Sequence, residues 1–296
     1  GPFRLCMLTI LFDGIAYGML LFILAVGLAV TMGLMNFINL AHGAFAMLGG
    51  YTTVVLMQSF GVPFLVCLPL AFMGSAILGA ALECTLYRPL YRKPHLDQVL
   101  FSIGLTFMAV ATADYFMGSS QQMVQLPEWL KGRTEWGEGA WMLGMGHYRI
   151  FIIAVCAALT LGLQHMLANT RFGSQLRAAV DDQRVAAGLG IYVNRVFLVT
   201  FAMGSGLAGL GGALGSEVLG LDPSFPLKFM VYFVNVVAVG GTSSVTGPLL
   251  AALLLGVADV AGKYYIPKLG GFVVYSLMVV VLVWRPQGLF VRRGGK

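Results

Sequence analysis

The stretch GLMNFINLAHGAFAMLGGY, residues 33–51, places Asn36, Asn39 and His42 inside an otherwise apolar run. Polar side chains are costly in a lipid environment unless something satisfies or uses them. Glycines follow at three positions, the first of which is Gly43. We therefore expect this segment to enter a membrane as an interrupted helix, with the polar side chains at the interruption.

The composition excludes an ordinary soluble domain. Of the 296 residues, 58% are hydrophobic and only 10% are charged, whereas roughly a quarter of the residues in a soluble domain carry a charge. Apolar runs recur from end to end, and each approaches the ~20 residues that a helix needs to cross a bilayer. The sequence predicts an all-α, polytopic transmembrane helical bundle that forms a single membrane domain over residues 1–296.

Nine apolar segments are candidate transmembrane helices, which gives about eight or nine crossings. Some of them contain polar or glycine-rich interruptions, so broken helices are expected in the bundle. The segments are residues 11–32, 36–58, 62–86, 98–118, 149–168, 195–219, 228–247, 248–262 and 270–284.

The positive charges predict how the chain is oriented. More than half of the 18 Lys and Arg residues lie in residues 88–95, 171–195 and 285–296, and alternating spans place these segments on one side. The positive-inside rule makes that side cytoplasmic, so we expect the C-terminus in the cytoplasm and residues 119–148 outside. The net charge of +6 is thus read as a signal for orientation in the lipid bilayer, and no nucleic-acid partner is expected.

A second interruption is expected near the C-terminus. The stretch VGGTSSVTGPLL, residues 239–250, breaks an apolar run with turn formers that include Thr242, Ser243 and Ser244. Two broken apolar segments in corresponding halves of a chain point to a transporter whose pathway lies where the helices break. These three hydroxyl residues therefore join Asn36, Asn39, His42 and Gly43 as candidates for the pathway.

One apolar segment carries a stripe of small residues. Gly204, Ala208, Gly212 and Ser216 recur at intervals of four, which places them on one face of a helix. A smooth face of this kind allows another helix backbone to approach closely. We expect a helix-packing role for this stripe.

Catalytic chemistry finds little support in the sequence. The phosphate-binding pattern G-x-x-x-x-G-K-[ST] is absent, and the four histidines are too scattered for a recognisable zinc site. Acidic residues inside apolar segments are candidate coupling sites for a proton-driven carrier. These acids are Glu83, Asp114, Glu217 and Asp259. The chain is expected to be a transport protein rather than an enzyme, with no cofactor of its own.

The connection at about residues 169–194 is predicted to hold short helices with small apolar residues on one side. Such a helix, held between two spans, suits docking into a groove on a partner protein; the alternative is a solvated surface helix. The candidate contact residues are Arg177, Ala178, Asp181, Asp182, Ala186 and Gly190.

The same segment carries a family resemblance. Its pattern R-A-x-x-x-D-x-x-x-A-x-x-x-G-I resembles the coupling loop of ABC-importer permeases of the branched-chain amino-acid type, the LivH-like family. Residues 33–51, the stretch LYRPLYRKP at residues 86–94, and VGGTSSVTGPLLAALLLG with the terminal RPQGLF resemble further signatures of that family. The resemblance extends over essentially the whole chain.

The resemblance implies an assembly in a bacterial inner membrane. This chain would form half of a transmembrane pathway with a second, LivM-like permease. Two cytoplasmic ATPase subunits would use the ATP, and a periplasmic substrate-binding protein would deliver branched-chain or other hydrophobic amino acids. Urea, short amides, and aromatic or small carboxylates remain alternative substrates. A proton-coupled secondary carrier that works through Glu217 or Asp114 is the rival of another class.

Two roles are open for the polar residues of the opening stretch. On a helix Asn39 and His42 lie one turn apart, so we expect their side chains to face one side. They would then either bind a passing polar group or satisfy backbone groups freed by the break. We favour the structural role, because a permease must release its cargo.

Overall fold

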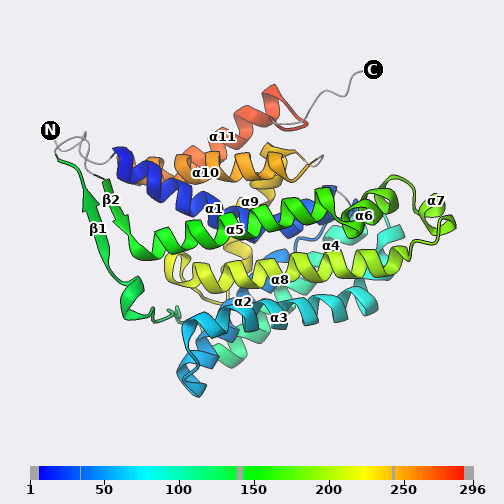
Figure 1. The fold of residues 1–296 in the computed structure, drawn as a ribbon, viewed down its shortest axis with the longest axis horizontal. Helices are drawn as coiled ribbons and strands as arrows, with labels where there is room; N and C mark the ends of the chain where they lie inside the picture. The colour runs from blue at the N-terminus through cyan, green and yellow to red at the C-terminus, as the bar shows by residue number, and fades with distance from the viewer. Residues whose placement is uncertain (1–6, 34, 139–142, 242–243, 290–296) are drawn as a thin grey trace. The chain divides into compact units, whose positions relative to one another are not determined.

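The computed structural model describes residues 7–33, 35–138, 143–241 and 244–289, and these residues are mainly helical (Figure 1). Each of the nine predicted apolar segments contains a helix, as expected for an all-α membrane bundle. The helices are α1 (Met7–Gly33), α2 (His42–Phe60), α3 (Phe64–Leu82), α4 (His95–Met117), α5 (His147–Asn169), α6 (Arg171–Asp181), α7 (Gln183–Gly188), α8 (Val193–Leu219), α9 (Phe225–Gly240), α10 (Thr246–Tyr265) and α11 (Gly270–Trp284).

Seven helices in the described ranges are long and apolar enough to cross a membrane. The count is lower than the eight or nine expected because α2 and α9 are not among the seven. With 19 residues α2 is long enough, but polar residues and glycines make it less apolar than the seven. Helix α2 begins only at His42, six residues later than the predicted start. Helix α9 has 16 residues, fewer than the ~20 that a straight crossing needs.

The chain divides into two compact units. The first comprises the described parts of residues 1–22, 125–158 and 235–296, and the second comprises residues 23–124 and 159–234. The second unit contains most of the residues singled out in the sequence, including the opening stretch and the segment at 169–194.

Helix α8 forms the centre of the second unit, because its small residues let other helices come very close. A Cβ atom added at Gly204 would reach the backbone of Gly27 in the second half of α1, and one at Gly212 would overlap the backbone of Ala46 in α2. Ala208 and Ser216 are fully buried on the same helix. Dispersion contacts between backbones at such distances are a main source of helix association in lipid.

The first unit uses the same kind of packing at another place. Gly18 in α1 lies against Gly256 in α10, where added Cβ atoms would overlap the facing backbone. The amino group of Lys263 lies 2.8 Å from the buried carboxylate of Asp259 one helical turn earlier. This ion pair keeps a charged acid inside an apolar helix, since a buried charge requires a partner.

The connection between α4 and α5 contains a feature that the sequence did not predict. Strand β1 (Arg133–Trp136) pairs antiparallel with β2 (Leu143–Gly146), with Arg133 opposite Gly146. The hydroxyl of Thr134 lies 2.8 Å from Nε2 of His147, which ties β1 to the first residue of α5. Each strand has four residues, too few for an alternating pattern to stand out.

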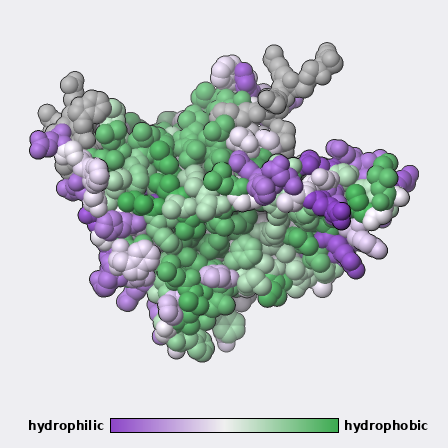
Figure 2. Space-filling view, viewed as in Figure 1, coloured by the Kyte–Doolittle hydropathy of each residue, from purple (hydrophilic) through white to green (hydrophobic). Residues whose placement is uncertain are grey.

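Large apolar side chains are exposed on many helices. Helix α4, for example, exposes Phe107, Met108, Tyr115 and Phe116. Figure 2 shows hydrophobic residues over much of the visible face and hydrophilic residues gathered over α6 and α7. This distribution is expected for helices whose outer surfaces face lipid.

The packing of α2 on α8 leads to a prediction. The Gly49→Ala substitution should lower the thermal stability of the detergent-solubilised chain, because the added Cβ would overlap the backbone of Gly209. Overpacking of this kind costs about 1–3 kcal/mol. The measurement is the apparent melting temperature, followed by size-exclusion chromatography after heating.

Gly74→Ala is the matched control, because that glycine also lies within a helix but has nothing within 4 Å of an added Cβ. The control should keep or slightly raise the melting temperature, since alanine favours helix by about 1 kcal/mol over glycine. Equal melting temperatures for the two variants would contradict the close packing of α2 on α8.

Candidate functional site: a helix break and a capped helix pair

The candidate site begins where the chain leaves its helical conformation between α1 and α2. Residues 35–41 are not helical, and Asn36 has a φ of +50°. Asparagine is among the few residues besides glycine that adopt this left-handed conformation readily. Asn36 is exposed, so its role here is to turn the backbone at the break.

Asn39 holds the break together through its side-chain oxygen. This oxygen accepts hydrogen bonds from the backbone N–H of Ala41 at 3.1 Å and from the hydroxyl of Tyr87 at 2.9 Å. The side chains of Asn39 and Tyr87 are almost completely buried. A buried amide oxygen with two donors replaces the hydrogen bonds that an unbroken helix would supply.

His42 faces different partners. Its Nε2–H donates to the carbonyl oxygen of Leu24 at 2.8 Å, and Phe233 lies edge-on to its ring at a centroid distance of 6.3 Å. The expectation that Asn39 and His42 share one helical face is wrong, because α2 begins at His42 and Asn39 precedes it. The adjacent Gly43 lies against the backbone of Pro226, where a side chain has little room.

Side chains of α4 satisfy further backbone groups of the break. The side-chain oxygen of Gln98 accepts the N–H of Ile38 at 3.2 Å, and its amide nitrogen donates to the carbonyl of Leu90 at 3.1 Å. The hydroxyl of Thr106 lies 3.4 Å from the carbonyl of Leu40. Sequence reasoning did not identify Gln98, although an amide within the first turns of an apolar helix was a usable signal.

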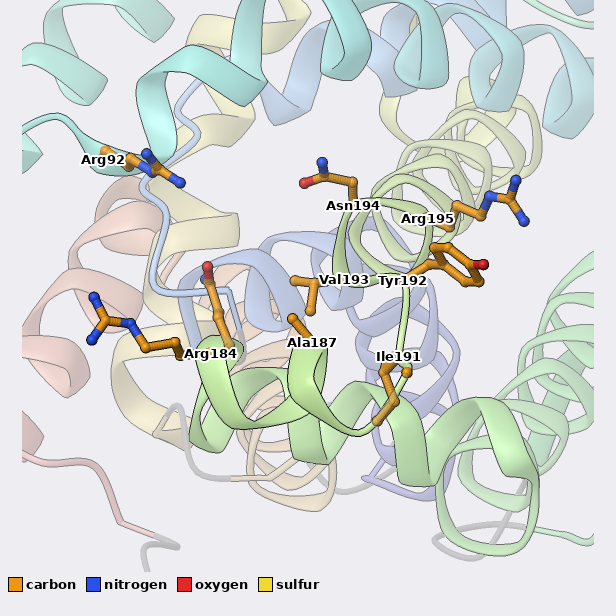
Figure 3. Close-up of a pocket in the computed structure, with 10 residues that line it drawn as sticks. Arg92, Arg184, Ala187, Ile191, Tyr192, Val193, Asn194 and Arg195 are labelled. Atoms are coloured by element: carbon orange, nitrogen blue, oxygen red, sulfur yellow. The ribbon is translucent and has the colours of Figure 1, made fainter.

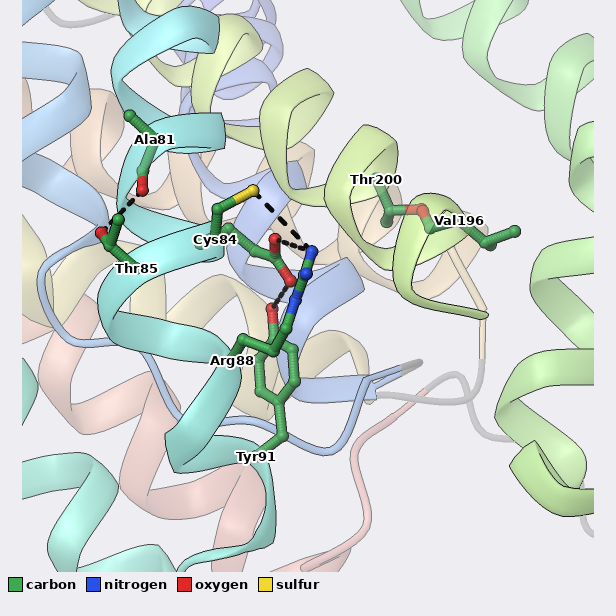
Figure 4. A network of polar contacts seen from close by, with 8 residues as sticks. Ala81, Cys84, Thr85, Arg88, Tyr91, Val196 and Thr200 are labelled. Carbon is green, nitrogen blue, oxygen red and sulfur yellow. Dashed lines mark hydrogen bonds and ion pairs between the residues drawn. The ribbon is translucent and has the colours of Figure 1, made fainter. Parts of the chain in front are cut away.

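A buried acid fixes the chain that follows α3 (Figure 4). This chain forms a π-helical turn, η2 (Glu83–Tyr87), and then the 3₁₀ turn η3 (Arg88–Arg92). The carboxylate of Glu83 lies 2.9 Å from a guanidinium nitrogen of Arg88 and accepts the hydroxyl of Tyr91 at 3.1 Å. Glu83 is fully buried, so these two partners are what make its charge tolerable.

The π-helical turn inserts an extra residue, and such turns often lie at functional sites. Here the turn directs the Tyr87 hydroxyl onto Asn39. Glu83 was one of the candidate coupling acids, and the structure places it in the interior. Of the other acids, Asp114 is exposed on α4, and Glu217 is half-buried on α8.

Aromatic contacts join these turns to α8. The ring of Tyr87 lies 4.9 Å from that of Phe201, and the ring of Tyr91 lies 6.0 Å from that of Phe197, both as centroid distances. Phe37 in the break packs edge-on against both tyrosines at 5.3 Å. The break, the turns after α3 and the first half of α8 thus form one packed cluster.

The segment before α8 consists of two short helices, as the sequence predicted for this region. Asp182 separates α6 from α7, and its carboxylate accepts the N–H groups of Arg184 at 2.9 Å and Val185 at 3.1 Å. Aspartate is a favoured N-cap for this reason. Gly190 then turns the chain with a φ of +87°, a conformation that suits glycine.

The remaining candidates of this segment differ in exposure. Arg177 is exposed but donates to the carbonyl of Leu167 and to the hydroxyl of Ser174. Ala178 is half-buried, Ala186 is buried and Asp181 is exposed. The large apolar side chains that α7 and its C-terminal end expose are Val185 and Leu189, at 58% and 75%, and the polar Gln183 and Arg184 are exposed beside them.

The second interruption belongs to the other compact unit. Thr242 and Ser243 lie outside the described residues. Ser244 is exposed, and its hydroxyl oxygen accepts the N–H of Gly247 at 3.3 Å at the start of α10. Gly241 has a φ of +83°, so the backbone does turn where the sequence placed an interruption.

The comparisons with known proteins agree over nearly the whole chain. The profile of a family described as "Branched-chain amino acid transport system / permease component" matches residues 10–282. The high-affinity branched-chain amino acid transport system permease protein BraD of Pseudomonas aeruginosa is 27% identical over 294 residues, which cover 95% of each chain.

Two relatives from Escherichia coli are similar at the same level. The permease protein LivH is 26% identical over 298 residues, which cover 95% of this chain and 94% of LivH. The permease protein LivM is 26% identical over 294 residues, which cover 92% of this chain and 68% of LivM. No solved structure matches this chain.

The buried hydrogen bond between Tyr87 and Asn39 is open to a double-mutant cycle. We expect Tyr87→Phe and Asn39→Ala to destabilise the chain individually and to show a coupling energy of about 0.5–1.5 kcal/mol together. The measurement is reversible unfolding in mixed detergent micelles. Tyr115→Phe serves as the control, because Tyr115 is 84% exposed and should show no coupling to Asn39. Additive effects of the first pair would mean that the bond does not hold the break.

Proposed function

The chain belongs to the family of branched-chain amino acid transport permeases, and on this basis we propose that it is one transmembrane subunit of an ATP-driven importer. A second, LivM-like permease would form the other half of the pathway. Two ATPase subunits would drive transport from the cytoplasm, and a periplasmic binding protein would supply the substrate. The C-terminus and the α6–α7 segment would then lie on the cytoplasmic side of a bacterial inner membrane.

The observation that carries this proposal is a continuous set of contacts from α7 to the helix break. Three side chains turn hydrophobic surface outward at α7 and just beyond it: Val185, Leu189 and Tyr192. Buried Ala186 anchors the other face of α7, and the Asp182 cap fixes its start. A short rigid helix with an exposed apolar face suits docking into a groove on a partner, which here would be an ATPase subunit.

Helix α8 follows α7 after only four residues, so a displacement of α7 moves the first turns of α8. Phe197 and Phe201 in these turns pack on Tyr91 and Tyr87, and Tyr87 holds Asn39 in the break. Packed aromatic rings and a buried hydrogen bond transmit movement better than flexible loops do, because packed interiors resist compression. ATP-driven closure of the ATPases would therefore reach the break through these contacts.

In this mechanism Asn39 and His42 support the pathway rather than bind the cargo. The side-chain oxygen of Asn39 already accepts from Tyr87 and Ala41, and Nε2 of His42 already donates to Leu24. A permease that holds its cargo weakly releases it readily, and the affinity for substrate resides in the binding protein. The same reasoning makes branched-chain amino acids the first substrates to test, since the relatives BraD, LivH and LivM are described as transporting them.

The proton-coupled carrier is the second candidate. A proton-coupled carrier needs acidic groups that protons can reach. Asp114 and Glu217 meet this need, because neither is buried. Neither lies among the residues of the break. We therefore place this candidate behind the ATP-driven importer.

The proposal is tested by uptake of radiolabelled leucine into liposomes that contain the chain with its companion subunits. We expect accumulation only with ATP on the ATPase side and binding protein on the opposite side. If binding protein stimulates ATP hydrolysis but no leucine is taken up, the assignment as an importer stands. Urea, short amides or carboxylates would then be the substrates to test. Uptake by the chain alone that follows a pH gradient would replace the importer with the carrier.

A matched pair of variants tests the role of α7 in the same assay. Val185→Asp should reduce retention of the ATPase subunits during purification and reduce uptake at least tenfold, because it places a charge on the docking face. Met123→Asp introduces the same charge at an equally exposed position, 58% in both cases, in the connection between α4 and α5. ATPase retention should be normal in the Met123→Asp complex, and equal retention in both variants would remove α7 from the docking surface.

A further inference from the structure

A pocket of about 760 Å³ lies between α7, the first turn of α8 and the end of η3 (Figure 3). Figure 3 shows Arg92 above and Arg184 below on the left of the view, with Asn194 to the right of both. The pocket adjoins the docking face of α7 and shares Tyr192 with it, but neither that apolar face nor the break explains its polar lining. The polar and aromatic residues that line it are Arg92, Gln183, Arg184, Tyr192, Asn194 and Arg195.

The lining of the pocket is strongly cationic. It includes three arginines and no acidic residue. Arg92 and Arg184 form no ion pair within the described part of the chain, and Arg195 lies over the ring of Tyr192 at 4.8 Å. The nearest acid in sequence, Asp182, already accepts two backbone amides. Unpaired guanidinium groups around one opening favour an anionic occupant, and their fork of donors suits phosphate oxygens.

Backbone amides add to this preference. Helix α8 starts at Val193 without a side-chain cap on its first turn, and Val193 and Asn194 line the pocket. The free N–H groups and dipole at the start of a long helix favour anions. The pocket therefore favours an anion for two reasons: the side chains from α7 and η3, and the backbone at the start of α8.

The depth of the pocket identifies the source of the anion. Arg92 is the last residue of the candidate span Phe64–Arg92, and Arg195 lies in the first turn of the candidate span Val193–Leu219. Span ends lie at the level of lipid head groups, where basic pockets between helices bind anionic lipids. Ile191 and Val193 add apolar lining, which suits the glycerol and upper acyl region of a lipid.

We propose that this pocket binds the phosphate of an anionic phospholipid head group through Arg92 and Arg184. Free phosphate or a nucleotide shares this chemistry but lacks the acyl chains that the apolar lining and the depth accommodate. The proposal is independent of the transported substrate and of the energy source.

The test is native mass spectrometry of the full chain in mild detergent with added phosphatidylglycerol or phosphatidylcholine. We expect one phosphatidylglycerol to remain bound under collisional activation that removes phosphatidylcholine. The Arg92→Gln/Arg184→Gln double variant should retain phosphatidylglycerol roughly tenfold more weakly. Arg171→Gln removes the same charge from the exposed start of α6, outside the pocket, and should retain the lipid normally.

Several results would overturn the proposal. Equal retention of the two lipids by the unmodified chain, or unchanged phosphatidylglycerol retention by the double variant, would each do so. Displacement of the lipid by millimolar inorganic phosphate would assign the site to a free anion. Unchanged lipid retention with weaker binding of the ATPase subunits would assign the pocket to that protein partner.

Should the double variant fail to insert, the Arg92→Lys/Arg184→Lys pair keeps both charges and removes the guanidinium forks. We expect intermediate retention of phosphatidylglycerol for this pair, because lysine holds phosphate as a point charge only. Retention equal to that of the unmodified chain would overturn the assigned role of the two arginines.

Discussion

The need to satisfy backbone hydrogen bonds where a helix is interrupted determines much of this structure. An apolar environment offers no water to the N–H and C=O groups of residues 35–41, so backbone and side-chain groups of the protein must replace it. Asn39 bonds Ala41 within the break, Tyr87 bonds Asn39, and Gln98 bonds Ile38. Each of these side chains is itself buried. The break therefore depends on two other segments of the chain, η2 and α4.

The supports of the break explain why neighbouring elements depart from regular helix. The π-helical turn after α3 aims Tyr87 at the break, and the ion pair between Glu83 and Arg88 holds that turn. The same turns pack on Phe197 and Phe201 near the start of α8. The glycines of α8 bring it into close contact with the backbones of its neighbours. Because packed interiors resist compression, a shift of its first turns is transmitted to the residues packed on them. The proposed docking helix α7, which lies just before α8, is well positioned to act on the break.

Much of the fold could be predicted from the sequence because hydrophobicity and length set the positions of membrane helices. The nine apolar segments all contain helices, and short helices in the segment at 169–194 were expected from the small residues there, although their caps were not. The start of α2 at His42 could not be predicted. The non-helical segment before it is held by contacts such as the hydrogen bond between Asn39 and Tyr87, which lie 48 residues apart in the sequence. The roles of Gln98 and of buried Glu83 depend on similarly distant contacts, and a single sequence does not reveal which residues meet in space.

The central claim is that ATP-driven movement reaches the break through α8 and Tyr87. The most direct measurement is hydrogen exchange of the amides of residues 35–41 in the full importer complex, compared between the nucleotide-free state and a state trapped with ATP. The account predicts that nucleotide changes this exchange in the unmodified complex and that Tyr87→Phe removes most of the change, while ATPase subunits stay bound. A nucleotide-dependent change of the same size in the Tyr87→Phe complex would contradict it.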